Sequence, residues 1–164
     1  MAKAVVLLKG IPVELGKTRP KELEALGLTV DYKRAVQRTQ PPYLLNCSVY
    51  YGTRQIAEIG FQSGWQKLEK KQIKNLPIMH VFLDVPSLGF NVNDVDFAKF
   101  SLPEAMRQLG KGAKCEPVRD EYTDITCRCG RHRIFLTYED EKAPSCLSVS
   151  IPLSRLQAWF LPLE

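Results

Sequence analysis

Long hydrophobic runs are missing from this chain. The longest apolar stretch, at about 76–85, is interrupted by His80 and Asp84 and falls well short of the ~20 residues that a membrane-spanning helix needs. The N-terminal segment MAKAVVLLKG has a lysine before only five apolar residues, and no small-residue cleavage site follows. It predicts a first strand and not a signal peptide. We expect a folded protein without a membrane segment.

A strong charge of one sign and an even set of cysteines are absent as well. The five cysteines are an odd number, and without a signal peptide we expect a cytoplasmic location and no disulfide framework. The net charge is only +5, from 23 basic and 18 acidic residues, and acidic clusters at 120–124 and 139–141 flank the arginine-rich stretch CRCGRHR at 127–133. This mixture argues against a uniform basic face for duplex DNA.

An internal repeat is present, and its first part predicts two short helices. TRPKELEALG at 18–27 aligns without a gap to SLPEAMRQLG at 101–110. The paired residues are Thr18 with Ser101, Pro20 with Pro103, and Gly27 with Gly110. The hydroxyl residue is placed to cap the helix, the proline belongs in the first turn, and the glycine permits a left-handed C-terminal turn.

The second part of the repeat predicts two hairpins. CSVYYGTRQI at 47–56 aligns without a gap to ITCRCGRHRI at 125–134, with Gly52 on Gly130. Residues that alternate before a glycine able to take a positive φ are typical of a strand that turns back on itself. The residues expected to point inward are Cys47, Val49 and Tyr51 in one copy and Ile125, Cys127 and Cys129 in the other.

A third strand is expected in each copy, at 81–88 and 147–154, and Pro86 and Pro152 are expected to end these strands. Each copy is then a helix followed by a three-stranded meander, and the helix must cover one face of its strands to bury a core.

These elements predict an α+β fold with roughly six to eight strands. Two tandem helix-plus-meander repeats, about 1–88 and 89–164, would form a single domain with one continuous antiparallel sheet. The helices are expected on one face, and the opposite face is expected to be partly open to solvent.

The cysteines of CRCGRHR raise the question of a metal site. Cys127 and Cys129 are two residues apart on the expected strand and share a side with Ile125, which favours burial as small core residues. The candidate zinc ligands would be Cys115, Cys127, Cys129, His132 and Cys146. Their spacing does not match the paired sets typical of structural zinc, so no metal and no cofactor is expected.

The stretch GIPVELGKT at 10–18 resembles a phosphate-binding loop. Such a loop has four residues between its first glycine and the Gly-Lys pair, whereas this stretch has five, and Pro12 offers no amide. Nucleotide binding by this stretch therefore stays a lesser alternative. The two histidines, His80 and His132, have no visible nucleophile and carboxylate in one motif, so we expect no catalytic residues and no enzyme.

The repeated pattern carried by TRPKELEALG and SLPEAMRQLG with their meanders resembles the two-repeat inhibitor proteins typified by the β-lactamase inhibitory protein. The pattern also resembles that of bacterial toxin-immunity proteins of similar build. The resemblance implies that the open face of the sheet binds a protein. The expected function is therefore that of a small immunity protein or inhibitor of a cognate cytosolic toxin or enzyme, and the mildly basic charge favours an acidic partner surface.

The residues expected to bind the partner are basic and aromatic, the types that dominate protein interfaces. They are Tyr50, Arg54, Arg128, Arg131, Arg133 and Phe135. Basic and aromatic residues on a sheet can also stack bases, so single-stranded RNA binding is the alternative. Nucleic acid is not the expected partner, because acidic residues flank the arginines.

Overall fold

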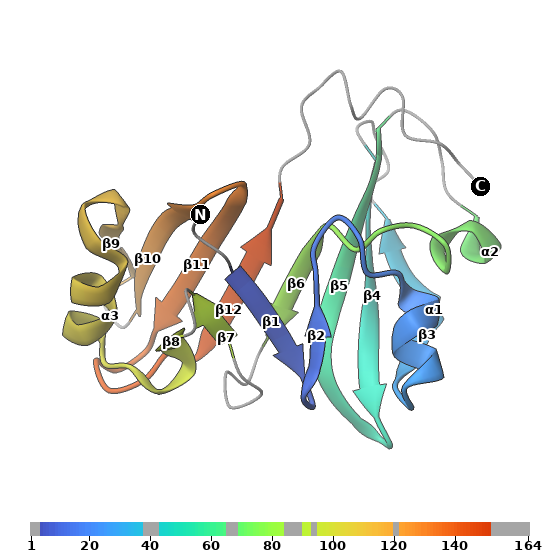
Figure 1. Ribbon diagram of the computed structural model, residues 1–164, viewed down its shortest axis with the longest axis horizontal. Coiled ribbons are helices and arrows are strands. Elements are labelled where there is room, and N and C mark those ends of the chain that lie inside the picture. Colours follow the sequence, from blue (N-terminus) through green and yellow to red (C-terminus); the bar gives the residue numbers. More distant parts are fainter. Residues whose placement is uncertain are drawn as a thin grey trace. The chain divides into compact units, whose positions relative to one another are not determined.

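The computed structural model describes residues 4–37, 43–64, 69–83, 90–92, 95–119 and 122–151. It is mostly antiparallel β-sheet with a few short helices, which confirms the α+β class. The chain divides into two compact units, and their helices and strands are labelled in Figure 1. The first unit takes the chain up to Val13 together with Phe82–Ser150, and the second takes Glu14–Val81 together with Ile151. The predicted repeats, about 1–88 and 89–164, are continuous in sequence, whereas each compact unit combines separate segments of the chain. The repeats therefore stay a prediction.

The second unit contains a helix and a meander. Its elements are α1 (Pro20–Ala25), β3 (Thr29–Gln37), β4 (Tyr43–Tyr51), β5 (Arg54–Gly64), α2 (Lys70–Ile73) and the start of β6 (His80–Leu83), and the strands are neighbours in the order β3-β4-β5-β6. The core is apolar and includes Leu23 of α1 together with Val49, Ile59 and Val81 of the strands, all exposed by less than 1%.

The first unit contains a second meander and a smaller sheet. The meander consists of β9 (Lys114–Arg119), β10 (Tyr122–Cys129), β11 (His132–Tyr138) and β12 (Cys146–Ser150), in the order β12-β11-β10-β9. The smaller sheet has the order β2-β1-β7-β8, formed by β1 (Ala4–Leu8), β2 (Ile11–Val13), β7 (Phe90–Val92) and β8 (Val95–Asp96). The helical elements are the 3₁₀ turn η2 (Phe97–Lys99), α3 (Leu102–Leu109) and the 3₁₀ turn η3 (Gly110–Gly112).

The segment before α3 is held to the core side of the meander. The buried Tyr138 hydroxyl donates a hydrogen bond of 2.9 Å to the Phe100 carbonyl, and the Leu102 amide donates to the Glu141 carbonyl at 2.9 Å. Ala105 of α3 is fully buried. One face of the β10–β11 hairpin is therefore core, and the other is left available to solvent.

The predicted helix signals are confirmed in all but one position. Pro20 and Pro103 lie in the first turns of α1 and α3, and Ser101 accepts a hydrogen bond from the Glu104 amide. The glycines that follow the two helices have positive φ, 97° at Gly27 and 76° at Gly110.

The cap predicted at Thr18 is wrong. The N-cap residue of α1 is Arg19, whose amide donates a hydrogen bond of 2.7 Å to a carboxylate oxygen of Glu22. The Thr18 hydroxyl accepts instead from the Glu14 amide at 2.9 Å. Because Glu22 satisfies the exposed amide, the helix begins one residue later than the hydroxyl would place it.

The predicted hairpins and the predicted first strand are confirmed. Gly52 and Gly130 have φ of 62° and 60° and begin turns of two residues, while Ala4–Leu8 of the N-terminal segment form β1. Cys47, Val49, Ile125, Cys127 and Cys129 are buried as predicted. Tyr51 is not, because 54% of it is exposed. The register shifts between Val49 and Tyr50, and this irregularity disrupts the alternation at the end of the strand.

The number of strands was underestimated. Each predicted three-stranded meander has a fourth strand at its start, β3 or β9, and the sheet of β1, β2, β7 and β8 was not predicted. The third strands are β6 and β12. Strand β12 ends before Ile151, whereas residues 84–88 of the first predicted strand and 152–154 of the second lie outside the described residues. Pro86 and Pro152 lie outside the described residues. The tandem repeat and the single continuous sheet stay predictions.

Candidate partner-binding face

The β10–β11 hairpin has two chemically different faces. Its core face consists of Ile125, Cys127 and Cys129 on β10 and Ile134, Leu136 and Tyr138 on β11, all of them buried. The alternate residues Arg128, Arg133 and Phe135 point the other way and are exposed, as the period of two requires. Their outward placement is confirmed, and their role in binding stays a prediction.

The strand register brings the exposed residues together. Arg128 lies directly opposite Arg133, and two residues further along the strands Thr126 lies opposite Phe135. On the other side of β10, Lys114 of β9 lies opposite Thr126. We call the set Lys114, Thr126, Arg128, Arg133 and Phe135 the basic face.

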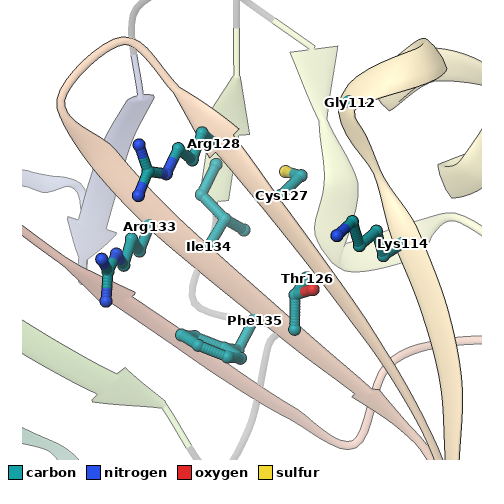
Figure 2. A pocket seen from close by; sticks show the side chains of 8 residues that line it. All are labelled: Gly112, Lys114, Thr126, Cys127, Arg128, Arg133, Ile134 and Phe135. Carbon is teal, nitrogen blue, oxygen red and sulfur yellow. The ribbon is translucent and has the colours of Figure 1, made fainter.

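An open hollow of about 370 Å³ lies on this face. Figure 2 shows Arg128 and Arg133 leaving neighbouring strands, with the Phe135 ring next along β11 and Lys114 on the opposite side. The lining residues are Gly112, Lys114, Thr126, Cys127, Arg128, Arg133, Ile134 and Phe135. Phe135 keeps 38% of its surface exposed, so an apolar ring and three cations are presented together.

The charge of the basic face is not balanced by ion pairs within the described part of the chain. The ion pairs found there join Lys17 to Glu14, Arg34 to Asp31, Lys71 to Glu69 and Arg107 to Glu104. None of them includes Lys114, Arg128 or Arg133. The acidic residue on the same side of β10 is Asp124, which accepts a hydrogen bond of 2.7 Å from the Thr137 hydroxyl.

The cysteines do not form a metal-binding group in the described ranges. All five are free thiols, and Cys115 alone is exposed. Burial, with a smaller contribution from Cys129, raises the pKa of Cys127 to about 11, so this thiol stays protonated at neutral pH. Among the residues that the structure describes, no group of three or more His, Cys, Asp and Glu side chains could hold a metal ion.

The stretch GIPVELGKT uses its amides internally. The Gly16 amide donates to the Ile78 carbonyl at 2.8 Å, and the Lys17 and Thr18 amides donate to the Glu14 carbonyl at 3.1 and 2.9 Å. The Lys17 ammonium pairs with the Glu14 carboxylate at 2.9 Å. A phosphate would have to displace these bonds, so the arrangement offers nucleotide binding no preformed cradle.

His80 lies half-buried on β6, where burial lowers its pKa. It crowds Gly60 of β5, where a Cβ atom would lie 3.0 Å from the His80 Cβ and 2.8 Å from Asn46 Oδ1. The pKa of His132, beside the β10–β11 turn, is also lowered, chiefly by burial.

The other predicted binding residues do not belong to the basic face. Arg131 is exposed at the tip of the β10–β11 turn, whereas Tyr50 and Arg54 belong to the second unit, half-buried and exposed respectively. Lys114 and Thr126 were missed. Thr126 follows from the alternation of β10, but Lys114 could be found only by predicting β9 and its register.

No protein-family model, curated protein or solved structure matches this chain. No helix in the described ranges is both long and apolar enough to cross a membrane.

Proposed function

We propose that this chain is a small binding protein, of the immunity or inhibitor type, that engages an acidic partner protein through the basic face. The observation that carries the proposal is the Arg128–Arg133 pair. Two arginines lie directly opposite each other across neighbouring strands, and like charges in this position destabilise a sheet. An acidic partner surface would neutralise that repulsion on docking, and exposed arginine and phenylalanine side chains are enriched in the cores of protein interfaces.

The small extent of the basic face favours a protein over a polyanion. Asp124 lies two residues from Thr126 on the same side of β10, and Glu139, Asp140 and Glu141 are exposed after β11. A chain of phosphates continuing past the three cations would meet this acidic edge, whereas a single carboxylate of a protein would not.

The order of elements supports the resemblance to two-repeat inhibitors. The chain runs through β1, β2 and α1 to the strands β3–β6, and then through β7, β8 and α3 to the strands β9–β12. We therefore take the two halves as copies of one unit, each a hairpin, a helix and a meander. The five free thiols support the proposed cytoplasmic location.

Single-stranded RNA is the second candidate partner. The observation that favours it is the exposed Phe135 ring beside Arg133 and Lys114, because such surfaces stack bases and hold phosphates. The two candidates differ in what they require. RNA binding would depend on Phe135 as a stacking platform and would weaken steeply with salt.

Photo-cross-linking from the basic face tests the proposal. Phe135 is replaced by a photo-reactive phenylalanine analogue in the native cell, with the same analogue at the exposed Tyr51 as the comparison position. The cross-linked protein is identified and purified, and its binding and activity are measured directly with this chain. We expect an acidic protein that is captured from position 135 only, binds the Arg128→Ser/Arg133→Ser variant at least tenfold more weakly, and loses activity when wild type binds.

Three results would contradict the proposal. They are cross-linking of RNA from position 135, equal capture of the same protein from position 51, and binding of the purified protein that the double serine variant does not weaken.

A further inference from the structure

The two arginines and the phenylalanine ring of the basic face lie in two separate rows. Arg128 and Arg133 form one row, and Thr126 and Phe135 form the next, two residues away along both strands. Residues two apart on a strand lie on the same side and about 6.8 Å from each other. The face therefore presents cations and a ring at a spacing that an extended chain reproduces with its own alternate side chains.

The first row suits a carboxylate. Guanidinium groups bind carboxylates through paired hydrogen bonds, and two of them project here from directly opposed positions. No ion pair among the described residues occupies either arginine. Lys114 lies in the second row, opposite Thr126, and lines the same hollow, so it adds a third positive charge without demanding a particular geometry.

The second row suits an apolar side chain. Phe135 presents a partly exposed ring, and the neighbouring Thr126 offers a methyl group next to it. The hollow of about 370 Å³ is near the lower end of the range of about 300–1,000 Å³ found for ligand sites. It is sized for a short segment with few side chains.

Resting on the proposed function, we infer that the partner inserts an extended acidic segment in which a carboxylate and an apolar side chain are two residues apart. The carboxylate lies between Arg128 and Arg133, and the apolar side chain packs on Phe135. The intervening residue points away from the sheet, so its identity has little effect on affinity.

Three labelled peptides test the spacing, each with the same neutral glycine-serine flanks. The first has the central sequence leucine-serine-glutamate-serine-leucine, which places leucines two residues from the acid in both chain directions. The second has serine-leucine-glutamate-leucine-serine, which has the same composition but turns the leucines to the opposite side of an extended chain. The third replaces the glutamate of the first with glutamine. Fluorescence anisotropy at physiological salt gives each dissociation constant, with a uridine decamer as a further probe.

We expect the first peptide to bind at least tenfold more tightly than the second and the third. Arg128→Ser and Phe135→Ser should each remove that preference, whereas Arg107→Ser, an exposed arginine on α3, should leave it unchanged. Unfolding curves of each variant show whether it is folded under the conditions of the assay.

The outcomes separate this inference from the proposed function. Equal binding of the first two peptides, lost in Arg128→Ser, would refute the spacing and leave an acidic partner in place. Absence of binding to all three would refute the peptide inference, and the cross-linking experiment would then decide the proposed function independently. Tighter binding of the uridine decamer that depends on Phe135 would overturn both in favour of RNA.

Discussion

Reversing the charge of Arg128 should stabilise this protein. Arg128 and Arg133 are exposed and directly opposite each other, and two like charges about 6 Å apart in water repel by about 0.7 kcal/mol. Arg128→Glu replaces that repulsion with an attraction of similar size. The free energy of unfolding should therefore rise by about 1 kcal/mol at low salt and by about half as much at physiological ionic strength, where the screening length is about 8 Å.

Urea unfolding at low and high salt measures the effect. An increase of this size moves the urea midpoint upward by about 0.3–1 M. The matched control is Arg54→Glu, which changes the net charge equally but lies opposite Tyr51 at the start of β5. The reasoning is refuted if the two variants have the same stability at low salt, or if the gain of Arg128→Glu is as large at high salt as at low salt.

Three further predictions concern the interior. Under native conditions a maleimide should label the exposed Cys115 first. Cys127 is buried and its pKa is raised to about 11, so it should react only after unfolding. Mass spectrometry measures the labelling of each cysteine, and equally fast labelling of both would contradict the burial of Cys127. Because the pKa of His80 is lowered in the folded state, the unfolded state takes up a proton first, so stability should fall as the pH drops below about 6.5, the usual histidine value. His80→Gln should weaken that pH dependence, and identical slopes in wild type and variant would exclude His80 as its source. Gly60→Ala should lower the free energy of unfolding by about 1–3 kcal/mol, because the added methyl group overpacks the contacts with His80 and Asn46. In a double-mutant cycle, Asn46→Ala should recover part of that loss. A Gly60→Ala variant that is more stable than wild type would show that these close contacts relax freely.

The sequence predicted the two hairpins because their signals are local. A glycine at positive φ fixes a two-residue turn, and the alternation of Ile125, Cys127 and Cys129 then determines which residues face the core. The outward placement of Arg128 and Phe135 followed from the same rule.

Strand β3 was not predicted because its side chains interrupt the sheet register. The Asp31 carboxylate accepts hydrogen bonds from the Lys33 and Arg34 amides, and the pairing with β4 shifts between Asp31 and Val36. A side chain that binds nearby amides competes with the ladder, so the alternation expected of a strand does not continue through this segment.

The hollow on the basic face depends on contacts that sequence reasoning did not supply. It needs β9 beside β10 in one register, so that Lys114 lies next to Thr126. The two-residue turn between β10 and β11 fixes Arg128 opposite Arg133, but it does not fix the pairing of β10 with β9. The arginine pair could be predicted, but its third cation could not.

The pairing of β1 with β7 has a consequence for synthesis on the ribosome. Ala4 pairs with Val92, and the whole of Glu14–Val81, most of the second unit, lies between them in the chain. Closing such a long loop costs entropy and slows folding, and the β1–β2 hairpin is only marginally stable by itself. During translation, we therefore expect the second unit to become protease-resistant first, while β1 waits with one edge unpaired for a strand that has not yet been made.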